Sequence, residues 1–362
     1  MNLFASTKIH GFGLDISDSS IKVAQLNLEN GQVSSAAFAD VALLDKTILN
    51  HQILNEQRLA GNILKAVSAA KNIDGKYVVC SVPEGKSFIR ILQIPKMPES
   101  EIDGAIPYEL EQDIPIPVDQ VYLDWQIINE LPDKLELLVA ASSKEYIDSL
   151  VETLRLAKLT PLAMEIGSQA TARALIGPEN LSKSVLVVDI GARQTSFTIV
   201  DQGNLQYTSS VPIAGNAFTE SITRNLGISA GAAEKLKQPL GLLTETQQGI
   251  NVRKAFLPIL DNVVDEIKNV IRFFEEHSVS HRRIETVFLC GGSASVPGLV
   301  EYILARINLG SDKGKLNVTL GNQWANLSAG AGNAEVPIAG EGALRYATAI
   351  GLALHGLDYE SR

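Results

Sequence analysis

Two hydrophobic hairpin patterns of the same kind stand about half a chain apart in this sequence. The stretch Ser184–Val200 (SVLVVDIGARQTSFTIV) runs from an apolar strand through a tight polar turn into a second strand, and Gly11–Leu26 (GFGLDISDSSIKVAQL) has the same order. Each apolar run ends on a carboxylate, Asp15 or Asp189, where the turn begins. Short apolar and alternating runs around polar turns predict β-hairpins. Their repetition predicts two related halves that face a shared cleft.

The rest of the first half alternates between strand and helix patterns. The hairpin continues into a predicted meander over residues 11–40, which includes an Asn-Gly turn. Apolar residues at helical spacing predict a helix over 52–71. The nearly all-apolar run 76–82 predicts a strand that is buried on both faces.

Residues 87–160 differ in pattern from what precedes them and predict a compact αβ module. A strand, a helical stretch over 99–114, a proline-rich exit, two alternating strands and a helix over 143–159 follow one another. Pro107 lies inside the helical stretch, where it predicts a kink or a restart of the helix. We interpret the module as an insertion, because the pattern of 161–176 predicts a helix that returns the chain to the first lobe.

The second half is more helical. Residues 215–280 carry mostly helical patterns, and a continuous apolar stripe over 256–277 marks the clearest helix. A predicted strand over 286–289 leads into Gly291–Gly292 and a helix that begins near Pro297, and a small-residue helix closes the chain. We therefore predict an α/β fold of two lobes with an inserted small αβ subdomain. The predicted division is 1–86 for the first lobe, 87–160 for the inserted subdomain, 161–183 for the return to the first lobe, 184–342 for the second lobe with a helical part over about 215–280, and 343–362 for the closing helix.

Composition and charge narrow the class of protein. With 362 residues and 45% hydrophobic content, the chain can bury two cores. A net charge of -10 argues against nucleic acid or anionic lipid as a partner, since both require a basic face. The sequence shows no signal peptide and no uncharged apolar run of about 18 residues, so we expect membrane attachment only through a partner. Cys80 and Cys290 lie in apolar strand patterns without a CxxC partner, which predicts buried thiols and a reducing, cytoplasmic location.

The two hairpin turns carry the residues expected to bind phosphate. Taken singly, Asp15 or Asp189 is an ordinary turn former, but as a matched pair the two carboxylates point at one cleft, where they would hold a hydrated Mg²⁺ beside phosphates. Backbone N–H groups and hydroxyls in the turns offer a cradle for phosphate oxygens. The residues expected to form this cradle are Ser17, Ser19 and Ser20 in the first turn and Gly191, Ala192, Gln194 and Thr195 in the second. Arg193 departs from an all-small turn, and its simplest interpretation is a solvated residue.

Three further groups bear on such a site. Gly291–Gly292–Ser293 follows a buried strand and precedes a helix, whose N-terminus favours negative charge. Glu234 and Lys237 share a helix face and by themselves form a surface ion pair. Glu165, on the helix predicted between the lobes, is by itself a solvated residue, but in a real cleft it lies near the place of an attacking water.

In this order, the motifs resemble those of the actin-like ATPase superfamily, which has a ribonuclease H-type two-lobed fold, over essentially the whole chain. Asp15 with Ser17–Ser20 corresponds to the first phosphate motif of that family, and Asp189–Thr195 to the second, DIGxxxT. The resemblance implies ATP and Mg²⁺ as ligands and a water-orienting role for Glu165. The further nucleotide contacts that it implies are Lys22, Gly215, Asn216, Glu234 and Lys237, with Gly291, Gly292 and Ser293 at the adenosine.

The inserted module narrows the resemblance. The segments GLDISDSSIKVAQL, IPYELEQDIPIPVDQV, VDIGARQTSF and AIGLAL are similar to the PilM family of type IV pilus assembly proteins, which share this subdomain with the division protein FtsA. The resemblance implies a cytoplasmic scaffold, peripheral at the inner membrane, that binds ATP with slow or negligible hydrolysis. It implies a place in a ring with the PilO-containing inner-membrane complex, near the assembly ATPase and platform proteins. It also implies that the N-terminal cytoplasmic tail of PilN binds at the inserted subdomain, where the candidate contacts are Ile106, Ile114, Ile116 and Val118.

Three other functions stay open at this point. A filament-forming division protein like FtsA would end in a basic amphipathic membrane helix, whereas this sequence ends in the polar, acidic HGLDYESR. A small-molecule kinase would need a catalytic base outside the two phosphate hairpins, and no clear Asp offers one. A nucleotide-free secretion relative would carry a membrane helix. Ser17 and Arg193 stand where many relatives carry Gly, which favours holding ATP over splitting it rapidly.

Overall fold

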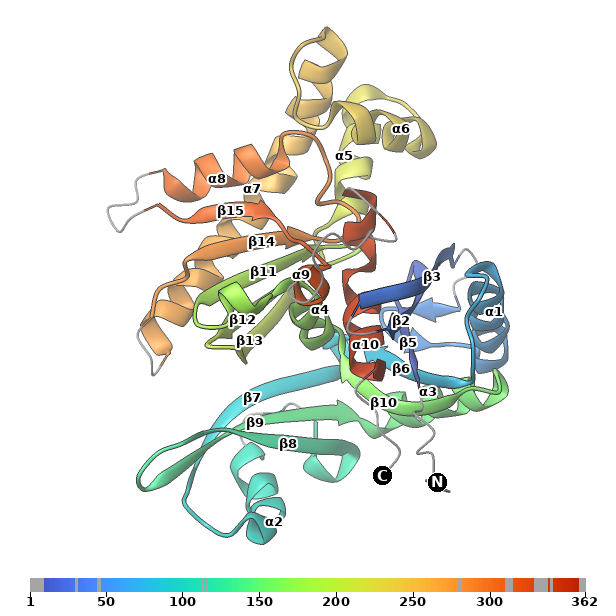
Figure 1. Ribbon diagram of the computed structural model, residues 1–362. Coiled ribbons are helices and arrows are strands. Elements are labelled where there is room, and N and C mark those ends of the chain that lie inside the picture. The colour runs from blue at the N-terminus through green and yellow to red at the C-terminus, as the bar shows by residue number, and fades with distance from the viewer. Residues whose placement is uncertain are drawn as a thin grey trace.

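Two lobes stand side by side with a small subdomain attached below them (Figure 1). The computed structural model describes residues 10–29, 32–43, 47–111, 114, 116–278, 282–309, 315–328, 338 and 341–357. Of the expected features, the Asn-Gly turn at 30–31 and the polar end of the chain after 357 lie outside the described residues, as do residues 310–314, 329–337 and 339–340 of the second lobe.

The first lobe is built on a five-stranded sheet in the order β10-β6-β1-β2-β3. Its strands are β1 (Phe12–Ile16), β2 (Ser20–Glu29), β3 (Gln32–Ala42), β6 (Tyr77–Val82) and β10 (Thr160–Ile166). β1, β2 and β3 pair antiparallel, while β6 and β10 continue the sheet in parallel. The apolar residues of the alternating pattern, such as Leu14, Val23 and Cys80, are fully buried. The short strands β4 (Ile48–Leu49) and β5 (Gln52–Ile53) form a separate ribbon.

The second lobe repeats this topology. Its strands are β11 (Ser184–Ile190), β12 (Thr195–Asp201), β13 (Asn204–Val211), β14 (Thr286–Cys290) and β15 (Asn317–Leu320). The first three pair antiparallel and the last two extend the sheet in parallel, which gives the order β13-β12-β11-β14-β15. Asp15 and Asp189 are each the penultimate residue of the central strand of a lobe, β1 or β11. The two related halves predicted from the hairpins are therefore confirmed.

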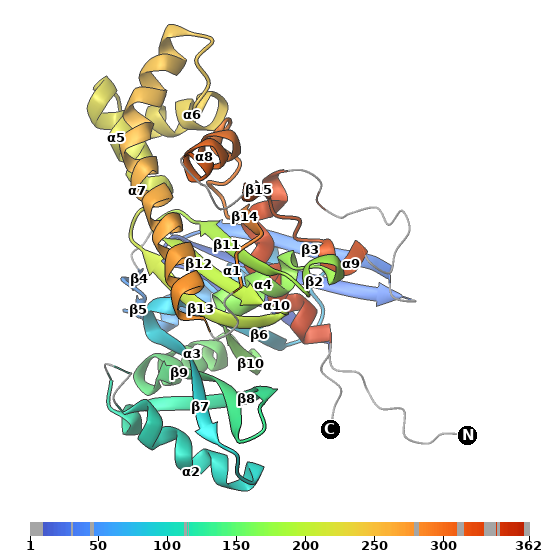
Figure 2. The same cartoon turned by 90° about the vertical axis from the view of Figure 1, so that its left-hand side faces the viewer.

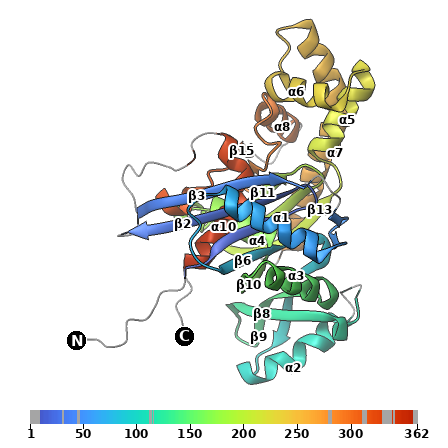
Figure 3. The same ribbon diagram turned by 90° about the vertical axis from the view of Figure 1, so that its right-hand side faces the viewer.

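Two helices lie between the sheets and hold the lobes together. α4 (Gly167–Leu175) follows β10, and α10 (Ala347–Leu357) follows the 3-10 turn η4 (Glu341–Tyr346). They pack against each other, with α10 on the first sheet and α4 against β12 (Figure 1). The outer face of the first sheet is covered by α1 (Glu56–Ala69) and α3 (Lys144–Leu156), which Figure 3 shows beside each other.

The remaining helices belong to the second lobe. The long α7 (Gln247–His277) runs along the sheet to a helical tip that it forms with α5 (Gly215–Leu226) and α6 (Ala230–Leu240) (Figure 2). Its buried stripe includes Phe256, Val263 and Phe274, as the apolar spacing predicted. α8 (Leu299–Asn308), α9 (Ala325–Ser328) and the 3-10 turn η3 (Pro178–Asn180) complete this side. Among the described residues, no helix is both long and apolar enough to cross a bilayer.

The inserted subdomain is a three-stranded antiparallel sheet with one helix across it. The strands β7 (Ser87–Pro95), β9 (Lys134–Ser143) and β8 (Val121–Glu130) lie in that order, and α2 (Glu99–Leu110) packs on them. The 3-10 turns η1 (Glu84–Lys86) and η2 (Val118–Gln120) precede β7 and β8. α2 runs through Pro107 as one helix, so of the two expected outcomes the restart does not occur. Two of the candidate partner contacts, Ile106 and Ile114, are core residues of this subdomain, so their side chains are not available to a partner. The other two, Ile116 and Val118, are partly buried and pack against that core.

Two element predictions are wrong. The helix expected over 161–176 is the edge strand β10 followed by α4, because residues 160–166 pair in parallel with β6. The helix expected to end the inserted subdomain, α3, packs instead with α1 in the core of the first lobe, through Tyr146, Leu150 and Leu154. Boundaries also shift: α1 begins at Glu56, after the N-cap residue Asn55.

Candidate functional site

A cavity of about 440 Å³ lies between the two lobes. It is lined by both hairpin turns, by the Gly291–Gly292 turn and by the first residues of α4 and α5. The structure thus brings together motifs that lie up to about 280 residues apart in the sequence. The predicted site residues that line this cavity are Asp15, Ser17, Ser19, Ser20, Lys22, Asp189, Gly191, Ala192, Gln194, Gly215, Asn216, Glu234, Lys237, Gly291, Gly292 and Ser293.

On the first lobe, Asp15 is held by polar neighbours. The Ser81 hydroxyl at the end of β6 donates to Asp15 Oδ1 at 3.1 Å. Lys22, directly opposite on β2, places Nζ 3.5 Å from Asp15 Oδ2. In the turn that follows, the Ser20 N–H donates to Ser17 Oγ at 3.1 Å, so the serines order the loop. The result is a carboxylate and an ammonium at the mouth of a small hydroxyl-rich turn.

On the second lobe, Asp189 faces Asp15 across the cleft. Enclosure by the cleft walls and the charge of Asp15 raise the pKa of Asp189 to about 7, and the nearby Lys22 ammonium only partly opposes this. Gly291, at a φ of 87°, packs against this carboxylate, where a Cβ would come within 2.2 Å of Asp189 Oδ1. Two carboxylates that cost free energy to ionise together suit a cation between them.

The turns of the second lobe are tied into one unit by backbone hydrogen bonds. Gly191 N–H donates to Gln194 O at 3.0 Å and closes the hairpin turn, while Gly215 N–H donates to Gly191 O at 3.1 Å. The Ser293 hydroxyl also donates to Gly191 O, at 3.0 Å. Thr195 differs from its prediction, because it is fully buried and its hydroxyl donates to Ile213 O at 2.6 Å, away from the cleft.

The pair Glu234 and Lys237 also lines this cavity. Lys237 is only 4% exposed, so it is not the surface residue of the simpler interpretation. Its Nζ lies 2.7 Å from Glu234 Oε2 and donates to Gly215 O and to the Thr219 hydroxyl. Because its burial is compensated by these acceptors, Lys237 ties α6 to the start of α5 beside the cleft.

Glu165, like Thr195, is a predicted site residue that does not line the cavity. It lies on β10 instead of a helix and does not line the cleft. Arg173 holds both carboxylate oxygens, at 2.7 Å from Nη1 to Oε2 and also through Nη2, and His355 Nδ1 lies 3.0 Å from Oε2. Burial acts to raise the pKa of Glu165, but the hydrogen bonds and charges of His355 and Arg173 outweigh it and lower that pKa. The structure therefore makes Glu165 a link between β10, α4 and α10.

Sequence reasoning missed several residues that line the cleft, among them Glu84, Asp18 and His51. Glu84 ends the apolar run of β6 after Pro83, which is the same signal that drew attention to Asp15 and Asp189. Burial raises the pKa of Glu84 above its ordinary value, while hydrogen bonds at Glu84 and Ser168 partly offset that effect. Asp18 and His51 had no comparable signal, since His51 comes from a separate two-strand ribbon.

The chemistry of the cleft fits a nucleotide with a hydrated cation. The described residues contain no group of three or more side chains able to ligate a metal directly. The cleft does offer two facing carboxylates, two lysines and three small turns with hydroxyls. Such turns bind phosphate oxygens through their N–H groups, and carboxylates hold Mg²⁺ through its waters.

Comparison with known proteins agrees with this geometry. The family model for the type IV pilus assembly protein PilM matches residues 13–357. The cell division protein FtsA of Bacillus subtilis is 22% identical over 277 residues, which cover 67% of this chain and 62% of FtsA, so the chain spans about three fifths of that relative.

Solved structures share the fold over a larger part of the chain. A chain of a PilM-PilN type IV pilus biogenesis complex matches with a TM-score of 0.80 at 23% identity, over 97% of this chain and 100% of that one. MreB5 of Spiroplasma citri bound to AMPPNP matches with a TM-score of 0.52 at 13% identity, over 88% of this chain and 93% of that one. The predicted actin-like fold is thereby confirmed. Since the family model spans nearly the whole sequence, the chain belongs to the PilM family of type IV pilus assembly proteins.

Proposed function

We propose that this protein is a nucleotide-binding scaffold of the type IV pilus assembly machinery. It binds Mg-ATP in the interlobe cleft, with slow or negligible hydrolysis, and it binds the N-terminal tail of PilN at the inserted subdomain. The observation that carries the proposal is the match of the whole fold, inserted subdomain included, to a chain of a PilM-PilN complex. The protein would sit at the inner membrane through PilN and its PilO-containing partners, as part of a ring.

The cleft supplies what a triphosphate and its cation need. Asp15 and Asp189 would hold Mg²⁺ through its waters, and the bound ion would neutralise charge on the phosphates. Lys22 and the turn N–H groups would receive phosphate oxygens, while Glu234 and Lys237, which line the same cavity, would contact the ribose. Glu165 is bound by Arg173 and His355 away from the cleft, which supports holding of ATP over rapid splitting.

The PilN tail has a candidate site at the joint of the inserted subdomain. A second cavity of about 240 Å³ is lined by Gln126 and Leu138 of that subdomain, by Arg173 of α4 and by Leu205 of β13. Gln126 comes from β8, which among the described strands pairs with β9 alone, so its other edge has no strand partner there. The Trp125 N–H donates to the Asp124 carboxylate at 2.9 Å instead of to a strand, which marks this open edge. Extended tails bind such edges by adding a strand.

One titration tests the partner assignment. A fluorescent peptide with the N-terminal sequence of the PilN from the same organism is titrated with the purified protein, with and without Mg-ATP. Saturable binding is expected, and a scrambled peptide is expected not to bind. Absence of binding in both conditions would remove the PilN assignment.

Calorimetry tests the nucleotide assignment separately. Asp15→Ala and Asp189→Ala are each expected to weaken Mg-ATP binding, because each removes one of the two carboxylates that face the cation. Unchanged ATP affinity in both variants would contradict the proposed site.

A further inference from the structure

A chain of side-chain contacts joins the two lobes where the two hairpin turns meet across the cleft. Arg193, in the turn of the second hairpin, donates from Nη1 to Asp18 Oδ2 in the turn of the first hairpin at 3.2 Å. Next to this pair, Gln194 Oε1 lies 3.0 Å from His51 Nε2, and Gln194 Nε2 donates to Glu84 Oε2 at 3.4 Å. All five residues line the same cavity.

Asp18 is the fixed partner in this contact. Its side chain is 6% exposed, accepts the His51 N–H at 3.1 Å and lies 3.4 Å from His51 Nδ1. His51 has a left-handed backbone, with a φ of 59°, in the turn between β4 and β5. Gly85 faces its ring, where a Cβ would come within 2.7 Å of His51 Cδ2. The Asp18 carboxylate therefore cannot leave its place without rebuilding this turn.

Arg193 is the adaptable partner. Its side chain is 43% exposed and projects from the turn that the Gly191–Gln194 hydrogen bond closes. A guanidinium carries five N–H donors in a planar fork, and within the described part of the chain only Nη1 contacts Asp18. The group can therefore bind a second anion while it keeps its contact with Asp18.

The two charges lie in the two hairpin turns, which line the cavity from opposite lobes. A terminal phosphate that reaches between the two hairpin turns would be repelled by Asp18 and attracted by Arg193. The shorter chain of a nucleoside diphosphate lacks that group. The pair therefore acts on the terminal phosphate and leaves the binding of the base, the ribose and the inner phosphates to other residues.

We propose that Arg193 is a specificity determinant of this cleft, which binds the terminal phosphate of a nucleoside triphosphate while Asp18 orients its guanidinium. This inference rests on the proposed nucleotide site. The contact between Arg193 and Asp18, which joins the two lobes, is then expected to be stronger with a bound triphosphate than with a bound diphosphate. Without Arg193, the fixed carboxylate of Asp18 opposes the triphosphate.

The test compares AMPPNP with ADP by calorimetry, both with Mg²⁺, on the full-length protein and three variants. Arg193→Gln should weaken AMPPNP binding about tenfold, as expected for a lost charge-assisted hydrogen bond, and leave ADP binding near the wild-type value. Asp18→Asn should shift the preference the other way, toward AMPPNP. The matched control is Arg306→Gln, because Arg306 is 42% exposed and pairs with Asp261 at 3.0 Å outside the cleft.

The variants separate this inference from the proposed function. If Arg193→Gln weakens both nucleotides equally, or neither, the inference is overturned while the nucleotide site stands. If Arg193→Gln strengthens AMPPNP binding, the Arg193–Asp18 pair blocks entry of the nucleotide and does not bind its phosphate. The inference is then also overturned. A wild-type protein that binds neither nucleotide would overturn both.

Discussion

Gly291 shows how one residue without a side chain shapes the cleft. A Cβ at this position would come within 2.2 Å of Asp189 Oδ1 and 2.6 Å of Ile190 O, at a φ of 87° that side-chain-bearing residues rarely adopt. The sequence shows only a Gly-Gly pair after a strand, which is a weak signal. The structure shows why glycine is needed at position 291, because the Asp189 carboxylate packs directly against it.

Gly291→Ala is therefore expected to weaken Mg-ATP binding by about tenfold or more. The added methyl group must displace Asp189 or the backbone, and such overpacking costs about 1–3 kcal/mol. Calorimetry measures the affinity, and circular dichroism verifies the fold. Gly231→Ala in α6 is the control, because a Cβ there meets nothing within 4 Å. Equal affinity in the two variants would contradict the packing argument.

Asp189 also predicts a pH dependence of stability in the absence of ligand. Since the folded state raises the pKa of Asp189 to about 7 from an ordinary 3.8, the folded protein holds this proton more tightly than the unfolded chain does. The stabilisation is present at low pH and is lost as the pH rises from about 4 through 7. Asp189→Asn removes the effect, so between pH 5 and 6.5 the wild type should lose about 1 kcal/mol per pH unit relative to the variant. Urea unfolding at several pH values measures this, and parallel pH curves would refute it.

At the residue scale, the sequence predicted the paired Asp motif well because the same pattern occurs twice. It could not place Thr195, since a hydroxyl in a turn can face either the cleft or the lobe, and here it donates to Ile213 O. Glu165 was misplaced because its partners Arg173 and His355 are 8 and 190 residues away in sequence. Pairing of this kind depends on the tertiary arrangement.

At the scale of elements, strong periodicity was predicted correctly and short edge elements were not. α7 and both hairpins follow their apolar spacing. β10 has a sequence, TPLAMEI, whose Leu, Ala, Met and Glu favour helix, and only pairing with β6 makes it a strand. α3 was assigned to the inserted subdomain, whereas it belongs to the core of the first lobe. Its apolar face predicts that the helix is packed against another element, but it does not identify that element.

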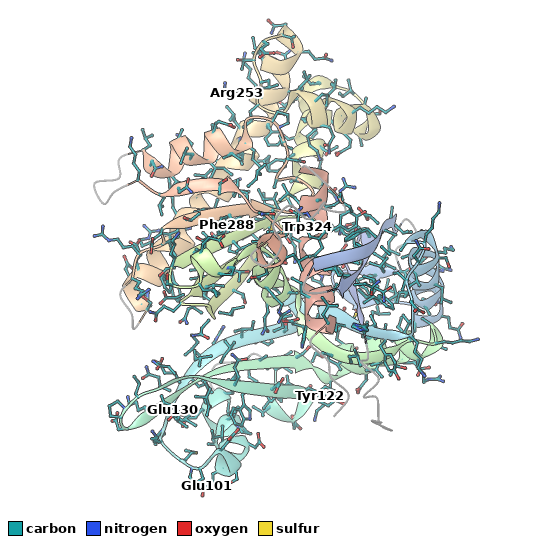
Figure 4. The ribbon with its side chains drawn as sticks, in the orientation of Figure 1. Glu101, Tyr122, Glu130, Arg253, Phe288 and Trp324 are labelled. Atoms are coloured by element: carbon teal, nitrogen blue, oxygen red, sulfur yellow. The ribbon has the colours of Figure 1, made fainter. Side chains whose placement is uncertain are left out.

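The open edge of β8 leads to a prediction for the partner peptide. Tyr122 stands at the inner end of this strand, close to the first lobe, and Glu130 at its far end (Figure 4). Gln126 is an exposed residue at the wall of the second cavity. Gln126→Arg should therefore lower the affinity for the PilN peptide about tenfold, because the larger, charged side chain conflicts with the bound peptide. The sheet should remain folded, since the substitution is at an exposed position. Fluorescence anisotropy measures the affinity. Asn129→Arg, exposed on the same strand and outside the cavity, should bind normally, and a loss in both variants would point to a nonspecific effect of charge.

At the scale of the whole molecule, two sheets of one topology are joined by few elements. Among the described residues, the link formed by Glu165, Arg173 and His355 ties β10, α4 and α10 at the centre of that joint. The two-lobed plan was predictable because it follows from a repeated motif. The joint was not, because it is built from residues of three separate segments.

Arg173→Ala should destabilise the protein by about 3 kcal/mol. The change leaves the Glu165 carboxylate, which is 5% exposed, with His355 but without its bidentate arginine, and a buried charge that loses its main partner is costly. Chemical unfolding measures the loss. Arg155→Ala breaks an exposed pair with Glu152 on α3 and should cost well under about 1 kcal/mol. Similar losses in both variants would show that the buried link contributes no more to the free energy of unfolding than an exposed ion pair does.

α4 serves two cavities at once. Gly167, Ser168 and Thr171 line the interlobe cleft, while Gln169, Ala172 and Arg173 line the cavity at the inserted subdomain. A helix of nine residues is too short to bend between its faces, so a ligand that shifts it on one side shifts the wall on the other. Thermodynamic reciprocity then requires that Mg-ATP change the affinity for the PilN peptide by the same factor by which the peptide changes the affinity for Mg-ATP. We expect a common factor of about ten from the two titrations, and a factor of one in either would mean that α4 separates the two sites without coupling them.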